Sequence, residues 1–278
     1  MKLKIYRPTT PSRRQMTGLL YRGVVTRQKP EKKLTSGFQR AKGRNAFGRI
    51  TVRHKGAGAK RLFRKIDFKY DKHNISAFVK SIEYDPNRSG FVALITYADG
   101  EKRYIIAPAE VKVGDKIINS ENAEMKPGNR SPLKKMPVGT FVFNIELKPG
   151  ANAVLCRSAG NYAEILAHEN HFTHLKLPST EIRKVPDSAW ASIGRVSKEE
   201  HNLVIIGKAG RSRHKGIRPT VRGSAMNPCD HPYGGGEGRM GRGTKRPKTA
   251  YGKTTGGVKT RKRRKYSNIF IVSRRKKK

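Results

Sequence analysis

The positive charge of this chain is concentrated at its two ends. Residues 1–64 contain 19 Lys and Arg against one acid, and residues 201–278 contain 23 against two. Residues 65–200 contain 20 against 17, so the formal net charge of +42 comes almost entirely from the flanks. A surplus of this size opposes compaction unless counter-charge neutralises it. The sequence therefore predicts a nearly neutral folded body with two cationic arms, and a polyanion, first of all nucleic acid, as the partner.

The body carries short apolar runs that are typical of β-strands. Phe91 to Tyr97 and Tyr104 to Ile106 flank Asp99-Gly100, a dipeptide that favours a tight hairpin turn. The other runs are equally short, β-branched or aromatic, and none shows sustained helical periodicity. We therefore expect an all-β body made of closed barrels or sandwiches.

One stretch divides the body into two halves. Residues 125–137 contain three prolines and a glycine, which make a poor strand, so we expect a linker there. The flanking segments, 61–124 and 138–206, are each near the lower size limit for a self-sufficient core. Small barrels suit that size, because closure removes the exposed edges of a sheet. We expect one barrel in each segment.

The arms, residues 1–60 and 207–278, are expected to be basic, non-globular extensions. Residues 207–265 are rich in Gly, Pro, Lys and Arg, so they cannot bury enough apolar surface to offset the entropy of ordering. We expect this arm to be extended when alone and ordered on a polyanion. Arginine supplies bidentate phosphate or guanine contacts, and glycine lets the backbone approach RNA closely. The alternative is a plain cationic linker.

Two histidine-containing motifs are candidates for metal binding or catalysis. His168, His171 and His174 are spaced as a triplet in an expected loop, but no cysteine or carboxylate at suitable spacing completes a metal site. Cys229-Asp230-His231 lacks a paired motif at finger-like spacing, so we expect no metal there either. Asp230 beside His231 resembles a general-base pair, yet no nucleophile is placed by the sequence. We favour a histidine that hydrogen-bonds RNA, with His231 as the one weak catalytic candidate.

Membrane and secreted classes fit the sequence poorly. No stretch approaches the roughly 18–20 apolar residues of a membrane span, and residues 1–16 lack the apolar core of a secretory signal. Two cysteines in a chain of 278 residues do not form a disulfide framework. We expect a cytoplasmic protein with reduced thiols and no membrane partner.

Several motifs together resemble the ribosomal protein L2 family of the large subunit, in its bacterial form. The most specific resemblance lies in the second arm, in Arg218 to Gly223, Ala225 to Pro228, Asp230 to Pro232 and Gly234 to Arg239. The body and the first arm also carry matching segments: Lys69 to Asp71, Ile82 to Arg88, Ala98 to Gly100, Tyr104 to Pro108, Gly128-Asn129, Arg157 to Gly160, Gly43 to Asn45 and His54 to Gly58. The resemblance therefore covers nearly the whole chain.

The resemblance implies a fold, a function and partners. It implies an oligonucleotide-binding (OB) barrel followed by a small SH3-like barrel, with basic extensions that enter large-subunit ribosomal RNA. It also implies a monomer in cytoplasmic, bacterial ribosomes that supports subunit assembly, subunit association and the architecture near the peptidyl-transferase centre, beside neighbouring large-subunit proteins and small-subunit contacts. No cofactor is expected, and RNA-associated Mg²⁺ stays open. Relatives often carry histidine where this chain has Tyr233 and an aliphatic residue where it has Cys229.

We accordingly expect a structural protein and not an enzyme. The open alternatives are a contribution to peptidyl transfer through His231 and a general nucleic-acid compacting or translational repressor protein. The residues expected to bind RNA are Arg53, His54, Lys55, Arg157, Lys208, Arg211, Arg213, Arg218, Arg222, Asn227, His231, Tyr233, Gly234, Gly235, Gly236 and Arg239.

Overall fold

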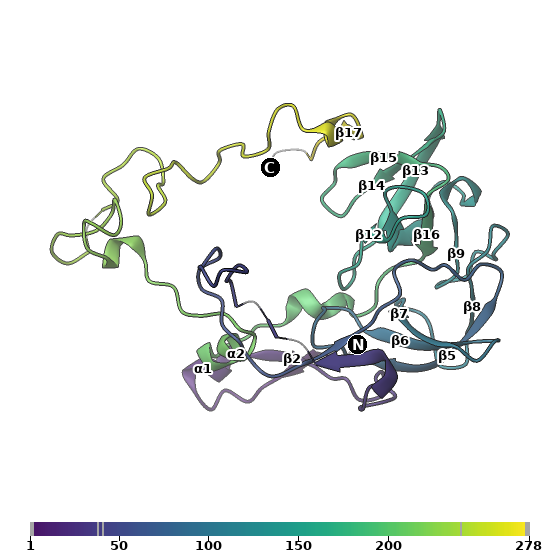
Figure 1. Cartoon of the computed structure of the whole chain (residues 1–278). Helices are drawn as coiled ribbons and strands as arrows, with labels where there is room; N and C mark the ends of the chain where they lie inside the picture. The colour runs from purple at the N-terminus through teal and green to yellow at the C-terminus, as the bar shows by residue number, and fades with distance from the viewer. Residues whose placement is uncertain (1–2, 38, 41, 240, 276–278) are drawn as a thin grey trace. The chain divides into compact units, whose positions relative to one another are not determined.

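The chain folds into two compact units, drawn in Figure 1. The computed structural model describes residues 3–37, 39–40, 42–239 and 241–275. The first unit, here called the barrel unit, comprises Met1–Gln39, Lys60–Arg211 and Ile269–Lys278. The second, here called the arm unit, comprises Arg40–Ala59 and Ser212–Asn268. Each unit is described by itself.

The first barrel is built on an antiparallel sheet in the order β7-β6-β5-β8. Its strands are β5 (Ser76–Glu83), β6 (Val92–Tyr97), β7 (Lys102–Ile106) and β8 (Lys116–Ile118). The expected hairpin is confirmed: β6 pairs with β7 across the Asp99-Gly100 turn, where Gly100 has φ +83°. Alternate residues of β5 and β6 bury one face in a core of aliphatic and aromatic side chains. This is the OB-fold barrel that the sequence predicted.

The second barrel contains a seven-stranded antiparallel sheet in the order β17-β15-β14-β13-β10-β16-β9. Its strands, together with a short β11–β12 pair, are β9 (Arg130–Pro132), β10 (Phe141–Phe143), β11 (Ile145–Glu146), β12 (Ala153–Leu155), β13 (Ala163–Glu169), β14 (Phe172–Lys176), β15 (Ile182–Pro186), β16 (Trp190–Ile193) and β17 (Ile271–Ser273). Its core is a separate buried cluster of aliphatic side chains. Two all-β bodies in sequence confirm the predicted fold class.

The stretch 125–137 is more regular than the linker that we expected. It contains β9 and a 3-10 helix, Leu133–Lys135, and Arg130 and Leu133 are buried. The reason is positional: β9 is the last strand of its sheet, with β16 as the one neighbouring strand among those described and a single further bridge from Arg130 to Asn119. An edge strand tolerates proline, because the missing N–H can face away from the ladder.

The terminal segments also contribute to the barrel unit. β1 (Leu3–Ile5) pairs with β2 (Thr17–Leu19) on either side of α1 (Pro11–Arg14), and β3 (Thr35–Gly37) pairs with β4 (Leu62–Arg64) after a 3-10 helix, Lys32–Leu34. Near the other end of the chain, β17 adds to β15. The basic ends are therefore only partly extensions, because about two thirds of the first arm and part of the second belong to the barrel unit.

The histidine triplet corrects a second expectation, which placed it in a loop. His168 lies in β13, His174 in β14, and His171 at the turn between them with φ +64°. The two strands run on into the turn because Thr173 and Phe172 complete the ladder with His168 and Glu169.

The arm unit has little regular structure. Its described elements are two 3-10 helices, Gly223–Ala225 and Tyr266–Asn268, and the end of α2 (Ala209–His214). A 3-10 helix of the barrel unit, Glu199–Leu203, precedes α2 in the chain. In the part of the chain that the structure describes, no helix is long and apolar enough to cross a membrane.

Candidate nucleic-acid interface

The arm unit holds a dense positive charge. Its residues include 22 Lys and Arg and only two acids, Asp230 and Glu237. Its chain is held by turns and backbone bonds, so most of the cationic side chains stay exposed. A body of this kind cannot neutralise itself and needs an external polyanion.

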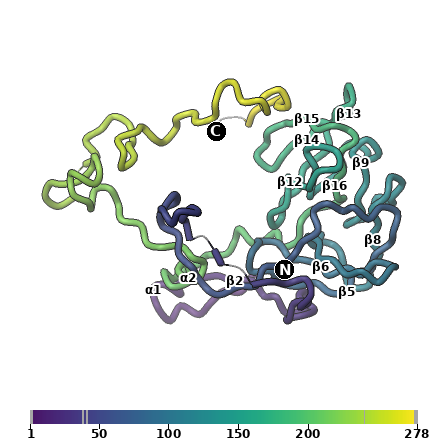
Figure 2. The backbone as a smooth tube through the Cα atoms, viewed as in Figure 1, coloured from purple at the N-terminus to yellow at the C-terminus, as the bar shows by residue number. Residues whose placement is uncertain are grey.

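Two distant segments of the chain pair within this unit, as the tube in Figure 2 traces. The N–H of Gly56 donates to the carbonyl of Gly216 at 2.8 Å, and the N–H of Ala59 donates to the carbonyl of His214 at 2.8 Å. The N–H of Arg218 donates to the carbonyl of His54 at 3.0 Å. These bonds join segment 54–59 to segment 214–219, which lie about 160 residues apart in sequence. The two arms are therefore one structure at this point.

Gly58 is what lets the two segments approach. Its φ is +64°, a conformation that side chains with a Cβ rarely adopt. A Cβ built on Gly58 would lie 2.5 Å from the carbonyl oxygen of His214 and 2.7 Å from the nitrogen of Gly216. Glycine here allows two protein segments to come into contact, whereas the sequence analysis assigned the glycines of the arm to close approach of RNA.

Five of the predicted RNA-binding residues meet at this pairing. His54 and Lys55 lie in the first segment and Arg218 in the second, while Arg53 and Arg213 immediately precede the two segments; all five are exposed. The Nδ1 of His54 lies 3.0 Å from the carbonyl oxygen of Pro219, so Nδ1 carries the proton and donates. The pairing thus gathers four permanent cations on adjoining backbone.

The signature loop, residues 222–239, is folded on itself by turns. The carbonyl of Asn227 accepts from the N–H groups of Asp230 and His231 at 3.0 and 3.3 Å. Gly234 N–H donates to the carbonyl of His231 at 2.8 Å, and Gly235 N–H donates to the carbonyl of Met226 at 3.1 Å. The loop has a defined shape of its own.

Three glycines of the loop are required by this folding. A Cβ on Gly234 would overlap the carbonyl oxygen of Asn227. A Cβ on Gly235 would lie 2.7 Å from Pro228, and one on Gly223 would lie 2.5 Å from the ring of His231. The sequence assigned Gly234, Gly235 and Gly236 to close approach of RNA; the structure gives the first two an internal reason, and Gly236 has φ +82° at the exposed end of the turn.

His231 and Tyr233 form the centre of the loop. The N–H of Tyr233 donates to Nδ1 of His231 at 3.1 Å, and their ring centroids lie 4.8 Å apart. The Tyr233 hydroxyl accepts from the Thr244 hydroxyl at 3.4 Å and from the backbone N–H of Lys248. The Thr244 bond, more than any other contact, holds the pKa of Tyr233 below its usual value. Both rings are half-buried.

This geometry argues against His231 as a general base. Because Nδ1 accepts from a backbone N–H, the neutral ring carries its proton on Nε2 and presents a donor there. Among the described residues, no hydrogen bond joins the Asp230 carboxylate to the ring. A ring N–H that donates suits a phosphate or base acceptor, not proton abstraction.

The other predicted residues of the loop, Arg222, Asn227 and Arg239, are exposed along it. Two contacts were missed by the sequence. The guanidinium of Arg53 lies 5.7 Å from the ring centre of Tyr251, and that of Arg242 lies 6.0 Å from Tyr233. Aromatic residues spaced among basic ones were the available signal, and they are typical of surfaces that stack on bases.

Three predicted residues lie in the barrel unit. Lys208 is exposed. Arg211 is half-buried, and its Nη1 donates to the carbonyls of Ile206 and Thr17 at 3.1 and 3.4 Å, so much of its donor capacity is used within the protein. Arg157 lies 4.6 Å from the ring centre of Phe68, and Arg88, which the sequence did not single out, lies 5.8 Å from the same ring.

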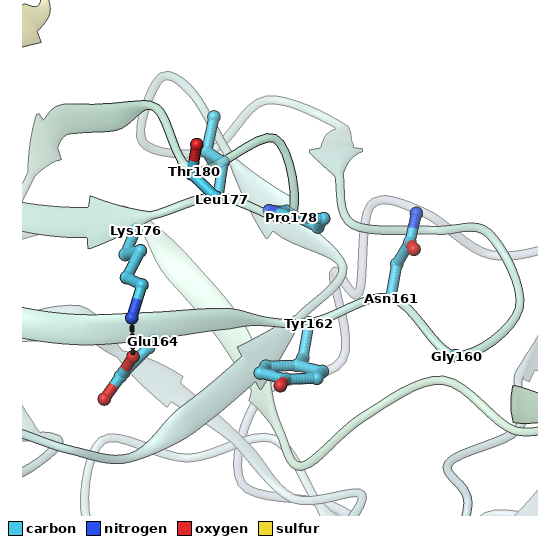
Figure 3. Close-up of a pocket in the computed structure, with 8 residues that line it drawn as sticks. All are labelled: Gly160, Asn161, Tyr162, Glu164, Lys176, Leu177, Pro178 and Thr180. Carbon is cyan, nitrogen blue, oxygen red and sulfur yellow. Dashed lines mark hydrogen bonds and ion pairs between the residues drawn. The ribbon is translucent and has the colours of Figure 1, made fainter. Parts of the chain in front are cut away.

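Figure 3 shows a hollow on the second barrel, lined in part by Tyr162, Glu164 and Lys176. Its one acid, Glu164, is paired with Lys176 at 3.0 Å. The side chains lining it include no histidine or cysteine. Across the described residues, no cluster of three or more His, Cys, Asp or Glu could hold a metal ion. The positively charged surface is therefore the better functional candidate.

Two family models match the chain. Residues 31–119 match the model described as Ribosomal Proteins L2, RNA binding N-terminal domain. Residues 126–252 match the model described as Ribosomal Proteins L2, C-terminal domain. The first match contains the strands β5 to β8 of the OB-fold barrel and segment 54–59. The second contains the strands β9 to β16 of the second barrel and the signature loop, but not β17. The chain belongs to the ribosomal protein L2 family.

Proposed function

We propose that this chain, a structural RNA-binding protein of the large ribosomal subunit, holds ribosomal RNA chiefly through its arm unit. The carrying observation is the pairing of segments 54–59 and 214–219 inside a unit with 22 cations and two acids. A preordered cationic surface loses less entropy on binding than two free arms would. The predicted residues, from Arg53 to Arg239, supply the phosphate and base contacts.

The same arrangement supports the finer parts of the role. By holding RNA segments in place, the protein promotes assembly of the subunit. We propose that its signature loop lies near the peptidyl-transferase region, and that the protein contacts neighbouring proteins and the small subunit. The protein works as a monomer in cytoplasmic ribosomes of bacterial type. We propose a structural role and not an enzymatic one, which the hydrogen bond from the Tyr233 N–H to Nδ1 of His231 supports.

Salt-dependent binding tests this function. Full-length protein is titrated with deproteinised large-subunit RNA between 50 and 200 mM salt. Six phosphate contacts predict roughly a thousand-fold loss of affinity over that range. Replacing Arg53, Lys55 or Arg218 by alanine should lower the slope of log K against log salt by about one each. Lys176→Ala, which removes the same charge from an ion pair on the second barrel, is the matched control.

Two results would contradict the proposal. One is RNA affinity that does not change with salt. The other is a triple variant at Arg53, Lys55 and Arg218 that binds as tightly and with the same slope as the Lys176→Ala control.

A further inference from the structure

A second, smaller feature of the arm unit has the geometry of a stacking site. Residues 43–52 form a closed hairpin. Arg44 and Ile50 form an antiparallel bridge, and the N–H groups of Thr51 and Val52 both donate to the carbonyl of Gly43, at 2.9 and 3.0 Å. The hairpin is thus held at its base by backbone bonds.

The tip is a tight turn. Asn45 N–H donates to the carbonyl of Arg49 at 2.9 Å, and Gly48 N–H donates to the carbonyl of Asn45 at 3.0 Å. The side chain of Asn45 accepts from the N–H of Arg49 at 2.9 Å. Gly48 has φ +76°, as a type I turn followed by a left-handed residue requires. The turn therefore fixes the backbone of Phe47 between Asn45 and Gly48.

Phe47 is 88% exposed, the highest value of any large apolar side chain described. The guanidinium of Arg44 donates to the carbonyl of Gly48 at 2.8 Å, so this cation reaches the residue that follows Phe47. Arg49 is two residues further along the chain than Phe47 and is also exposed. In the described chain, no other ring lies against Phe47. An exposed aromatic ring on a closed turn that also carries two arginines offers a platform for an unpaired base whose phosphates the arginines neutralise.

We propose that Phe47 stacks on an unpaired nucleobase of the ribosomal RNA, with Arg44 and Arg49 on the adjoining phosphates. The inference rests on the proposed function and adds a base-stacking site to it. The binding requires the aromatic face of the ring and not only its apolar area. The ligand is single-stranded or bulged RNA, because the bases of a continuous helix are already stacked on each other.

The test compares three replacements at one position in the full-length protein. Phe47→Ala removes the ring, Phe47→Leu keeps a large apolar side chain without a π-face, and Phe47→Tyr keeps the face. The side chain is exposed, so folding should be unchanged, which circular dichroism and thermal melting check. Binding is measured on deproteinised large-subunit RNA at a salt concentration where the wild-type affinity is measurable.

We expect Phe47→Ala and Phe47→Leu to weaken binding by about 5- to 150-fold, with an unchanged salt slope, and Phe47→Tyr to stay within about two-fold of wild type. Arg49→Ala should instead lower the slope. Wild-type-like binding by Phe47→Leu or Phe47→Ala would overturn the stacking site, as would a Phe47→Tyr variant as weak as Phe47→Ala. Salt-independent binding by the wild type would instead overturn the proposed function.

Discussion

Replacing Gly58 by alanine should separate the two paired segments of the arm unit. The new Cβ would lie 2.5 Å from the carbonyl oxygen of His214, and both neighbours are backbone, which cannot turn aside as a side chain can. The left-handed conformation at φ +64° adds a cost of about 1–2 kcal/mol. Relieving the overlap sacrifices the Gly56–Gly216 and Ala59–His214 hydrogen bonds, at about 0.5–1.5 kcal/mol each. The pairing should lose about 2–5 kcal/mol in all.

Amide hydrogen exchange measures this loss directly. In the RNA-free protein, exchange at the N–H groups of Gly56 and Ala59 reports opening of the pairing. The expected loss of free energy corresponds to exchange that is roughly 30- to 5,000-fold faster in Gly58→Ala. RNA affinity should fall as well, because the two segments must then be ordered during binding.

Gly252→Ala is the matched control. Gly252 also has positive φ, +74°, but a Cβ there would meet nothing within 4 Å. Gly252→Ala should lower stability only by the backbone strain of its own turn, and it should leave the amide exchange rates of Gly56 and Ala59 unchanged. The reasoning is refuted if Gly252→Ala speeds exchange at these two amides as much as Gly58→Ala does, or if neither amide is protected in the wild type.

Three further outcomes follow from the loop and the two thiols. Gly234→Ala should unfold the signature loop and weaken RNA binding, whereas Gly241→Ala, with open space around its Cβ, should not; equal binding in a filter assay would contradict this. His231→Ala should cost about 1–3 kcal/mol of loop stability, because it removes the acceptor of a backbone N–H. Purified large subunits should therefore contain less of the variant protein, while the rate of peptide-bond formation in assembled subunits stays near that of wild type. A rate that falls by orders of magnitude with normal assembly would show catalysis. Partial burial raises the pKa of the half-buried Cys156 thiol to about 12, so at pH 8 a thiol reagent should label exposed Cys229 much faster than Cys156 in the native protein. Equally rapid labelling of both thiols would contradict the raised pKa of Cys156.

Local patterns in the sequence predicted the barrels well. The Asp99-Gly100 turn lies where the hairpin was expected, because its signal is confined to adjacent residues. The stretch 125–137 was misread for the opposite reason. Proline content alone does not say whether a strand lies at an edge, and Pro132 is tolerated because it lies in the last strand of its sheet, beyond the residue, Arg130, that bridges Asn119.

Long-range pairing left no local trace. Nothing in the sequence of residues 54–59 indicates residues 214–219 as their partner. The three hydrogen bonds that join them are between backbone groups, which every residue type except proline possesses in full. The composition of each arm correctly indicated an excess of cations, but it implied two separate extensions. The sequence could name His231 and Tyr233 among the RNA-binding residues, but it could not show that Nδ1 of the histidine already accepts a hydrogen bond from the tyrosine N–H.

Charge and glycine carry different kinds of information in this chain. The cations indicate the class of partner, since a cluster of 22 mostly exposed Lys and Arg attracts phosphate whatever the order of these residues in the sequence. The glycines determine the shape in which those charges are presented, since Gly58 and Gly234 stand where a Cβ would collide with protein backbone. Substituting a cation should therefore change the salt dependence of binding, and substituting one of these glycines should change the intrinsic affinity with the salt slope of the remaining contacts preserved. A chain with the same charge and no such glycines would still bind RNA, but it would have to order its arms in doing so.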